Sequence, residues 1–367
     1  MKKAVLITII AAIGMILVGG AMAFVSLAAS GFNITNMMNT VEYEEKTVIL
    51  SEDFSNMRVE MGNHDIEFLK STDEDTHFVY YQNENEEFDV AVNGNTLEIV
   101  NRQNAGVNGL NRIFVMDLND NSCKLYLPKD VYENLTASVG SGDMTSAIPV
   151  SFADVKIELG SGDLAFENAK TNNFAARAGS GDISVKNTDS EEFDVHTGSG
   201  DITLQTIGAN NLSVEASSGD IQVNGAAVNE LFYAKATSGE ISCMEITCKD
   251  ADVKTTSGSI SADHVQCVGD FEGKVTSGSA GLAEVVADGN FKVKTVSGSI
   301  NLNYCDGANM ELQAGSGSVK GTIKTGKIFE ATAGSGSISV PANDENGGKC
   351  VIHTGSGDIR IEIANEE

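Results

Sequence analysis

Hydrophobic and polar residues alternate along most of the chain, and a glycine turn interrupts the alternation at regular intervals. A Ser-Gly dipeptide recurs every 19 to 21 residues. Two residues after its glycine the side chain is always apolar, and seven residues before it most copies carry a large apolar side chain, such as Phe174 and Phe193. A period of two is typical of strands with one buried face. No helical period occurs between the glycines.

The repeat has twelve copies, which differ mainly in the residue that follows the glycine. The glycines are Gly142, Gly162, Gly181, Gly200, Gly219, Gly239, Gly258, Gly278, Gly298, Gly317, Gly336 and Gly357. The residue after them is Asp143, Asp163, Asp182, Asp201, Asp220, Glu240, then Ser in five consecutive copies, and finally Asp358.

One repeat holds a strand, a glycine turn, a second strand and a return loop, but it cannot enclose a core by itself. Stacked copies can, because each strand then pairs in parallel with its counterpart in the next copy. The sequence therefore predicts an all-β fold, a parallel β-solenoid (β-helix) of about twelve rungs of 19–20 residues over residues 129–367. Glycine suits the corner because stacked corners require a positive φ or a close approach of backbones. A propeller or a sandwich is the alternative, although a propeller blade usually needs about 40 residues or more.

Residues 41–128 are rich in predicted strands but lack the regular repeat. Two alternating segments on either side of Asn93-Gly94 predict a hairpin, since this dipeptide suits a tight primed turn. Residues 61–66 are similar to a degenerate repeat corner. We expect this region to form atypical first rungs or an irregular β cap over the open N-terminal edge of the solenoid.

The N-terminal residues 1–29 predict a membrane anchor. Lys2 and Lys3 precede 26 residues without a charge, enough as a helix to cross a hydrocarbon layer of about 30 Å. The lysines favour a cytoplasmic N-terminus, with residues 30–40 as a tether and the β domain outside the cell. A cleaved signal peptide is the alternative, because Ala21-Met22-Ala23 fits a cleavage site. We expect a single-pass cell-membrane protein with an extracellular β domain.

The formal net charge of −28 argues against nucleic acid as a partner, because phosphates would be repelled.

The acidic residues of the corners are the first candidates for a metal site. Asp143, Asp163, Asp182, Asp201 and Asp220 would stack at rung spacing and repel one another, and bridging Ca²⁺ ions would relieve the repulsion. The alternative is that Asp and Ser both hydrogen-bond the backbone of their own turn. The change from Asp to Ser in later copies favours this second hypothesis, and we expect no other cofactor.

Four lysines, Lys235, Lys254, Lys274 and Lys294, occupy one outward position on consecutive rungs. They could form a stripe for an anionic wall polymer. The outward position two residues earlier carries Asp252, Glu272, Glu311 and Glu330, which could instead pair with the lysines across rungs and cancel much of the field.

The remaining reactive residue types predict no active site. Cys248 and Cys267 share one register and should be neighbours, either as a disulfide or as two small core side chains. None of the five histidines has a metal-ligand spacing. Neither a phosphate-binding loop nor a G-x-S-x-G elbow with its helix is present, and we identify no catalytic residue.

The hydrophobic N-terminus, the irregular β region and the Gly-Ser-Gly-Asp corners every 19–20 residues resemble the bacterial "putative adhesin" β-strand-repeat family over residues 45–363. The resemblance implies a cell-envelope protein with a β-helical ectodomain and no established catalytic residues. We therefore expect a non-enzymatic cell-surface protein that serves adhesion or envelope sensing, with a cell-wall or surface polymer or a membrane protein as partner. The alternatives are a scaffold or spacer for a membrane partner and, third, a carbohydrate-active β-helix enzyme.

Overall fold

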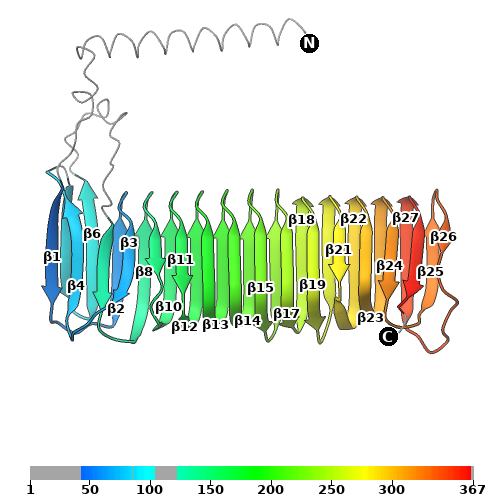
Figure 1. Cartoon of the computed structure of the whole chain (residues 1–367), viewed down its shortest axis with the longest axis horizontal. Coiled ribbons are helices and arrows are strands. Elements are labelled where there is room, and N and C mark those ends of the chain that lie inside the picture. The colour runs from blue at the N-terminus through cyan, green and yellow to red at the C-terminus, as the bar shows by residue number, and fades with distance from the viewer. Residues whose placement is uncertain (1–42, 85, 104–121, 365–367) are drawn as a thin grey trace, which may run out of the picture.

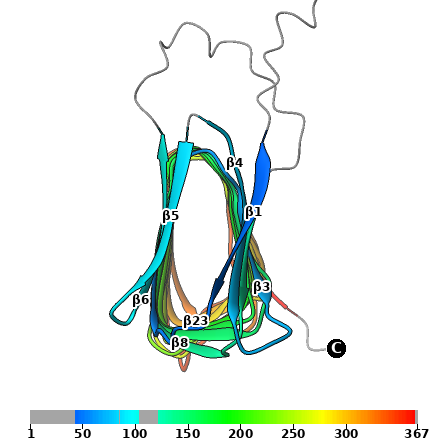
Figure 2. The same cartoon turned by 90° about the vertical axis from the view of Figure 1, so that its left-hand side faces the viewer.

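The computed structural model describes residues 43–84, 86–103 and 122–364, and these form a rod of stacked β-strands (Figure 1). The strands join one 28-stranded sheet that is wound into a solenoid, and the described residues contain no helix. Seen from its end, the rod is a flattened coil with two broad faces (Figure 2). The all-β parallel β-solenoid predicted from the repeat is therefore confirmed.

Each rung contributes one strand before the Ser-Gly corner and one after it. The strands that precede a corner are β8 (Val131–Val139), β10 (Val150–Leu159), β12 (Ala169–Ala178), β16 (Leu231–Ala236), β18 (Asp250–Ser257), β20 (Phe271–Ser277), β25 (Ile328–Ala333) and β27 (Lys349–Ser356). The strands that follow a corner are β9 (Met144–Ser146), β11 (Leu164–Glu167), β15 (Ile221–Val228), β17 (Ile241–Cys248), β19 (Ile260–Cys267), β21 (Ala280–Ala283), β24 (Val319–Ile323), β26 (Ile338–Ser339) and β28 (Ile359–Ile363). Longer strands that run from one rung into the next are β13 (Ile183–Thr197), β14 (Ile202–Ala216), β22 (Val286–Ser297) and β23 (Ile300–Ser316).

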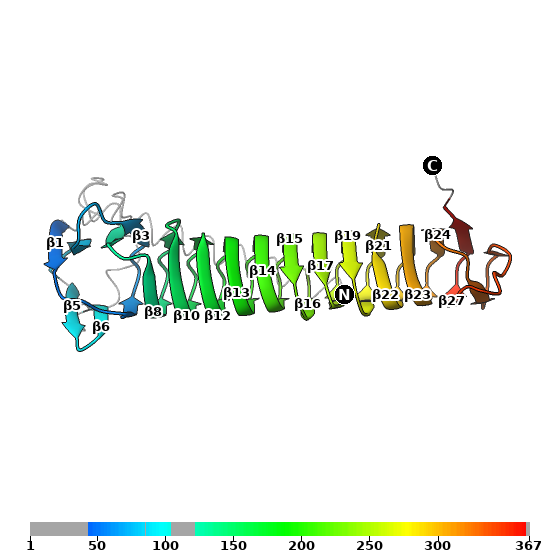
Figure 3. The ribbon, with the colours of Figure 1, turned by 90° about the horizontal axis from the view of Figure 1, so that it is seen from below.

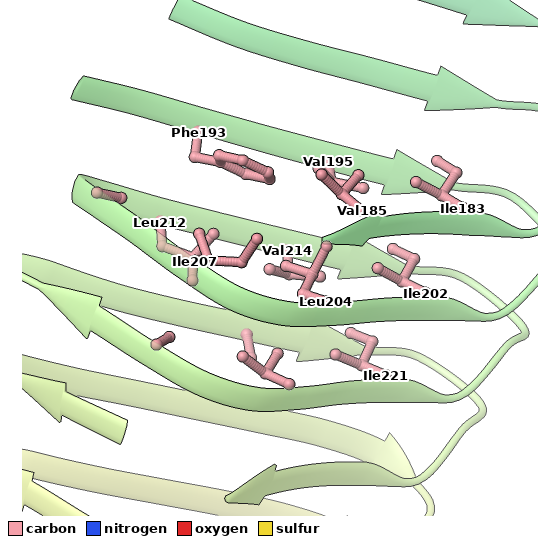
Figure 4. Packing of buried hydrophobic residues seen from close by; sticks show 14 of the residues in the cluster. Ile183, Val185, Phe193, Val195, Ile202, Leu204, Ile207, Leu212, Val214 and Ile221 are labelled. Carbon is pink, nitrogen blue, oxygen red and sulfur yellow. The ribbon is translucent and has the colours of Figure 1, made fainter. Parts of the chain in front are cut away.

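The register is parallel and places equivalent repeat positions side by side. Phe174 pairs with Phe193 and Phe271 pairs with Phe291, as the repeat predicts. Their rings stack at centroid distances of 4.7 and 5.3 Å. Ile183, Ile202 and Ile221 form a similar inward column two residues after the corner (Figure 4). Burial of each such side chain stabilises the rod by about 1.5–3 kcal/mol.

The N-terminal end is closed by strands that partly run antiparallel. These strands are β1 (Glu44–Leu50), β2 (Asn56–Met61), β3 (Ile66–Lys70), β4 (Thr76–Gln82), β5 (Glu86–Asn93), β6 (Thr96–Gln103) and β7 (Cys123–Leu127). The hairpin predicted around Asn93-Gly94 is confirmed as β5 and β6. β2 and β3 form a rung whose corner lies against that of Gly142, whereas β1 and β4 pair antiparallel beyond it.

The rungs do not follow chain order at either end. β2 lies between β6 and β8, although β6 follows β2 in the chain. At the other end β27 lies between β23 and β25, and β28 lies between β24 and β26. Figure 1 shows β25 and β26 beyond β27, and Figure 3 shows the same end of the rod from below. The last segment of the chain is therefore inserted one rung before the end of the rod, so β25 and β26 form the terminal rung.

Among the described residues, no helix is long and apolar enough to cross a membrane. The expected anchor at residues 1–29 and the tether at residues 30–40 lie outside the described residues. Both remain predictions.

Candidate binding groove

The acidic corner residues form a hydrogen-bonded ladder along the rod. The backbone N–H of Asp163, Asp182, Asp201, Asp220 or Glu240 donates to the Oδ1 of the corner Asp in the preceding rung, at 2.7–2.8 Å. Asp143 donates in the same way to Asp65 of the first rung. One oxygen of each aspartate carboxylate in this ladder therefore accepts a hydrogen bond from the neighbouring rung.

The serine corners continue the ladder with a shorter side chain. The N–H groups of Ser279, Ser299 and Ser318 donate to the Oγ of the preceding corner serine at 3.2–3.3 Å. Asp358 donates to Ser318 because its rung, not that of Ser337, comes next in space. The hypothesis that Asp and Ser bond the backbone of their own turn is thus corrected, since these side chains accept from the next rung.

The corner glycines line up in a second column because the backbones approach closely. A Cβ on Gly162 or Gly181 would overlap the carbonyl oxygen of the corner glycine in the preceding rung. Only Gly258, Gly278, Gly298, Gly336 and Gly357 among the twelve also have φ values between 131° and 155°. In the corners from Gly142 to Gly239, close approach alone therefore requires glycine.

The five corner aspartates are the candidate Ca²⁺ ligands, and the structure spaces them one per rung. In residues 43–84, 86–103 and 122–364 no three His, Cys, Asp or Glu side chains are grouped so that they could hold a metal ion. One oxygen of each aspartate already accepts an N–H. Calcium binding by this column stays a prediction.

The lysine column is paired with carboxylates on its own face of the rod. Lys254 bonds Asp252 at 2.5 Å and Lys274 bonds Glu272 at 2.7 Å. Lys294 contacts Glu311 at 3.0 Å, and Lys235 contacts Glu215 of the preceding rung at 3.0 Å. The structure therefore supports charge compensation, which is one of the two hypotheses for this column. A stripe of free ammonium groups is not formed.

A cavity of about 770 Å³ runs beside this paired face, over the first residues of the strands that precede the corners. One wall, which we call the edge row, is formed by Asp250, Asp270, Asn290, Asn309 and Lys349. The other wall, the face row, is formed by Asp252, Glu272, Lys292, Glu311 and Val351. The side chains between the two rows point into the core, so their backbone forms the floor. We call this cavity the groove.

The edge row is held rigid by bonds between rungs. The N–H of Asp270 donates to Asp250 Oδ1 at 2.8 Å, and that of Asn290 donates to Asp270 Oδ1 at 2.7 Å. The N–H of Lys349 donates to Asn309 Oδ1 at 3.1 Å. This second ladder was not identified from the sequence, because its positions mix Leu, Asp, Asn and Lys and carry no repeated residue type.

Two glutamates of the face row, Glu272 and Glu311, are favoured in the ionised form. Burial alone would raise the pKa of Glu272, but the hydrogen bond and charge of Lys274 outweigh it and hold the pKa below its ordinary value. Burial is likewise outweighed at Glu311, where Lys294 and Lys292 lower the pKa. A glycosidase needs a carboxyl group with a raised pKa as its general acid. These two glutamates are suited to accepting hydrogen bonds and not to donating a proton.

No cysteine or histidine is among the described residues that line the groove. Cys248 and Cys267 are neighbours, as predicted, with an Sγ–Sγ distance of 3.4 Å and free thiols. His64 is buried in the first corner and bonds Glu86 at 2.8 Å. This buried pair joins the first rung to the hairpin, and the sequence carried no signal for it because 22 residues separate the partners.

The fold defines a class of protein, the two-faced parallel β-solenoid with glycine corners. The chain belongs to the family described as Toastrack DUF4097, whose profile matches residues 54–244 and 228–367. The resemblance found in the sequence, to adhesin-type β-repeat proteins, is thereby confirmed at the level of the family.

Three solved structures to which the chain is similar are distant in sequence. A "putative lipid binding protein" from Parabacteroides distasonis is 17% identical, with 89% of this chain and 98% of that chain covered and a TM-score of 0.36. A "putative cell adhesion protein" from Clostridium sporogenes is 11% identical over 88% and 100% of the two chains, with a TM-score of 0.25. A "putative adhesin" from Parabacteroides merdae is 14% identical over 89% and 98%, with a TM-score of 0.28. No curated protein matches the chain. These similarities are too distant to transfer a ligand or an activity.

Proposed function

We propose that this protein is a non-enzymatic binding protein of the cell surface, held there by its N-terminal segment, which presents a long repetitive face to a polymer of the cell wall or surface. Adhesion and envelope sensing are both served by such binding. The proposal is supported by the hydrophobic N-terminal residues, by membership of the Toastrack family and by the groove.

One observation carries the proposal: the groove crosses several rungs without a break. Its edge row runs from Asp250 to Lys349 over five stacked rungs, at about 4.8 Å per rung. An enzyme cleft of a β-helix would need clustered acids with separated pKa values, whereas Glu272 and Glu311 both have lowered pKa values. A site that repeats along an axis suits a ligand that also repeats.

The experiment uses the full chain in two parallel capture assays. The purified protein is mixed with isolated cell-wall material and, separately, with detergent-solubilised membrane proteins. Saturable sedimentation with the wall supports the proposal, and capture of a membrane protein alone would favour a scaffold. Protease treatment of intact cells tests the location, since an exposed β domain is cleaved and an internal one is not.

A further inference from the structure

We infer that the groove binds a linear, non-anionic polysaccharide that lies along the rod axis, with about one sugar ring per rung. This inference rests on the proposed function, which it narrows to one site and one class of ligand. It follows from the shape, the period, the chemistry and the charge of the groove.

The period of the groove matches a sugar chain better than a peptide. Equivalent groups along either wall are one rung apart, about 4.8 Å. An extended peptide advances about 3.3–3.4 Å per residue and would fall out of step within two rungs. A β-1,4-linked pyranose chain advances by nearly one rung per ring. Alternate rings are turned over, so each ring presents hydroxyl groups to the walls at its own rung and every second ring presents the same face.

The chemistry of the walls suits hydroxyl groups. Two carboxylates, those of Asp250 and Asp270, are followed along the edge row by the amides of Asn290 and Asn309. Both kinds of group accept hydrogen bonds, and the amides also donate. Oδ1 of Asp252, on the face row, is buried and has no hydrogen-bond partner among the described residues. Since buried polar atoms are normally paired, this oxygen is an acceptor available to a ligand hydroxyl.

An apolar surface lies where the groove begins. Leu231, in line with the edge row, is 41% exposed. Tyr233, in line with the face row, carries the ammonium group of Lys254 over its ring at 5.4 Å. Aliphatic side chains pack against the apolar faces of sugar rings, so Leu231 provides a platform at this end of the groove. The Lys254 ammonium group covers one face of the Tyr233 ring.

The charge of the edge row disfavours a polyanion. Five carboxylates line the groove, and the three on the face row are paired with lysines: Asp252 with Lys254, Glu272 with Lys274 and Glu311 with Lys294. Asp250 and Asp270, on the edge row, have no ion-pair partner among the described residues. Lys292 is already engaged by Glu272 at 3.7 Å and Glu311 at 3.4 Å, and Lys349 by Glu330 at 3.3 Å. An anionic polymer would meet the unpaired carboxylates of Asp250 and Asp270 on the edge row, whereas neutral or amine-bearing rings would not be repelled.

The test is calorimetric titration of the full chain with β-1,4-linked oligomers of glucose, N-acetylglucosamine and glucosamine, from two to eight rings long, and with oligogalacturonate as the polyanion. We expect affinity for at least one non-anionic series to rise with length and to level off at five to six rings, about the number of rungs in the groove. Oligogalacturonate should bind at least about tenfold more weakly. Tighter binding of the polyanion, or no binding of any non-anionic series, overturns the inference.

Two variants test whether the oligomers bind in the groove. Glu272→Ala combined with Glu311→Ala should weaken the best oligomer at least about tenfold. The matched control is Asp194→Ala, which removes a carboxylate at the same repeat position, paired with Arg177 at 2.9 Å but outside the groove. It should leave the affinity unchanged. Equal affinity of all three proteins, with unchanged melting temperatures, places the ligand elsewhere and overturns the inference.

The same variants separate the inference from the proposed function. If the protein sediments with wall material and the groove variant does so equally, the proposed function stands and the groove is the wrong site. If oligomers bind in the groove but wall material does not sediment with the protein, the site stands and the wall is the wrong source of the ligand.

Discussion

The N–H of Asp163 donates a 2.8 Å hydrogen bond to the carboxylate of Asp143, one rung earlier in the rod. The two residues are 20 positions apart, and each subsequent corner as far as Glu240 repeats the bond to its neighbour. A side chain on the outer surface thus replaces the backbone pairing that the turn interrupts. This relationship explains why both Asp and Ser are used after the corner glycine, since each provides a short oxygen acceptor.

Replacement of Asp182 tests this ladder. Asp182→Ala leaves the N–H of Asp201 without its acceptor, now bonded at 2.7 Å, and should cost about 1 kcal/mol because water can partly replace the bond at this exposed site. Asp182→Ser should cost less, because the serine corners make the same bond through Oγ. Urea unfolding of the three proteins measures the difference. Equal loss in both variants would mean that the carboxylate charge matters and the acceptor position does not.

Replacement of a corner glycine should be far more damaging than replacement of a strand glycine. In Gly181→Ala the new Cβ overlaps the carbonyl oxygen of Gly162, and neither backbone can move without separating two rungs. We expect a loss of at least about 3 kcal/mol. The matched control is Gly281→Ala, where the nearest atom is Ile260 O at 4.0 Å. It should be neutral or stabilise by about 0.4–1 kcal/mol. Similar denaturation midpoints for the two variants would contradict the close-approach explanation.

The repeat made the interior of the rod predictable, because a fixed period and an alternating pattern leave one register that buries the apolar side of each strand. Phe174 and Phe193 had to meet once the corners were stacked. The order of the last rungs was not predictable in this way. The segments that begin at Lys327 and Lys349 carry equivalent corners, so either could pair with β23, and the connecting loops decide which one does.

A second feature escaped the sequence for a similar reason. The residue six positions after the corner glycine adopts a left-handed conformation in eight consecutive rungs, from Asn168 (φ 62°) to Tyr304 (φ 55°). Asn tolerates this conformation, but Thr206, Glu245 and Tyr304 do not favour it. The bend is therefore imposed by the winding of the rod.

Only one wall of the groove could be predicted from the sequence. The face row was recognised as outward and charged, whereas the edge row has no repeated residue type.

The six cysteines should be unreactive in the folded protein. All six are buried and free, and burial raises the pKa of Cys123, Cys243 and Cys350 to about 12. At pH 8 only about one thiol in 10,000 with such a pKa is ionised. A maleimide polymer should add no label to the native protein and six after denaturation. Four labels after denaturation without reductant would indicate a disulfide, for which Cys248 and Cys267 at 3.4 Å are the candidates.

Removal of calcium should leave the stability of the rod unchanged. The corner aspartates are explained by the N–H groups that they accept, so no cation is needed to hold the column together. We expect the melting temperatures in excess Ca²⁺ and in excess chelator to agree within about 1 °C. A rise with Ca²⁺ that disappears in a combined Asp182→Asn and Asp201→Asn variant would instead establish the ion site.

Acid should weaken the N-terminal end of the rod through the buried pair of His64 and Glu86. Burial alone would raise the pKa of Glu86, but the bond and charge of His64, with Asn101 and the Asn83 backbone, hold it below the ordinary value of 4.5. Because the folded-state pKa lies below the unfolded one, this carboxylate stabilises the protein above pH 4.5, and the contribution is lost as pH falls through the lowered value.

Glu86→Gln provides the measurement for this pair. The variant should be about 1–3 kcal/mol less stable at pH 7, because hydrogen bonds to a charged group are lost, and the difference from the natural protein should shrink as pH falls below 4.5. The control is Glu158→Gln, an exposed glutamate whose pKa Lys156 lowers at the surface of the rod, and it should change stability little at any pH. Urea midpoints at several pH values between 3 and 7 give the curves. A difference between the natural protein and Glu86→Gln that stays constant down to pH 3 would show that the lost bonds do not depend on the charge of Glu86.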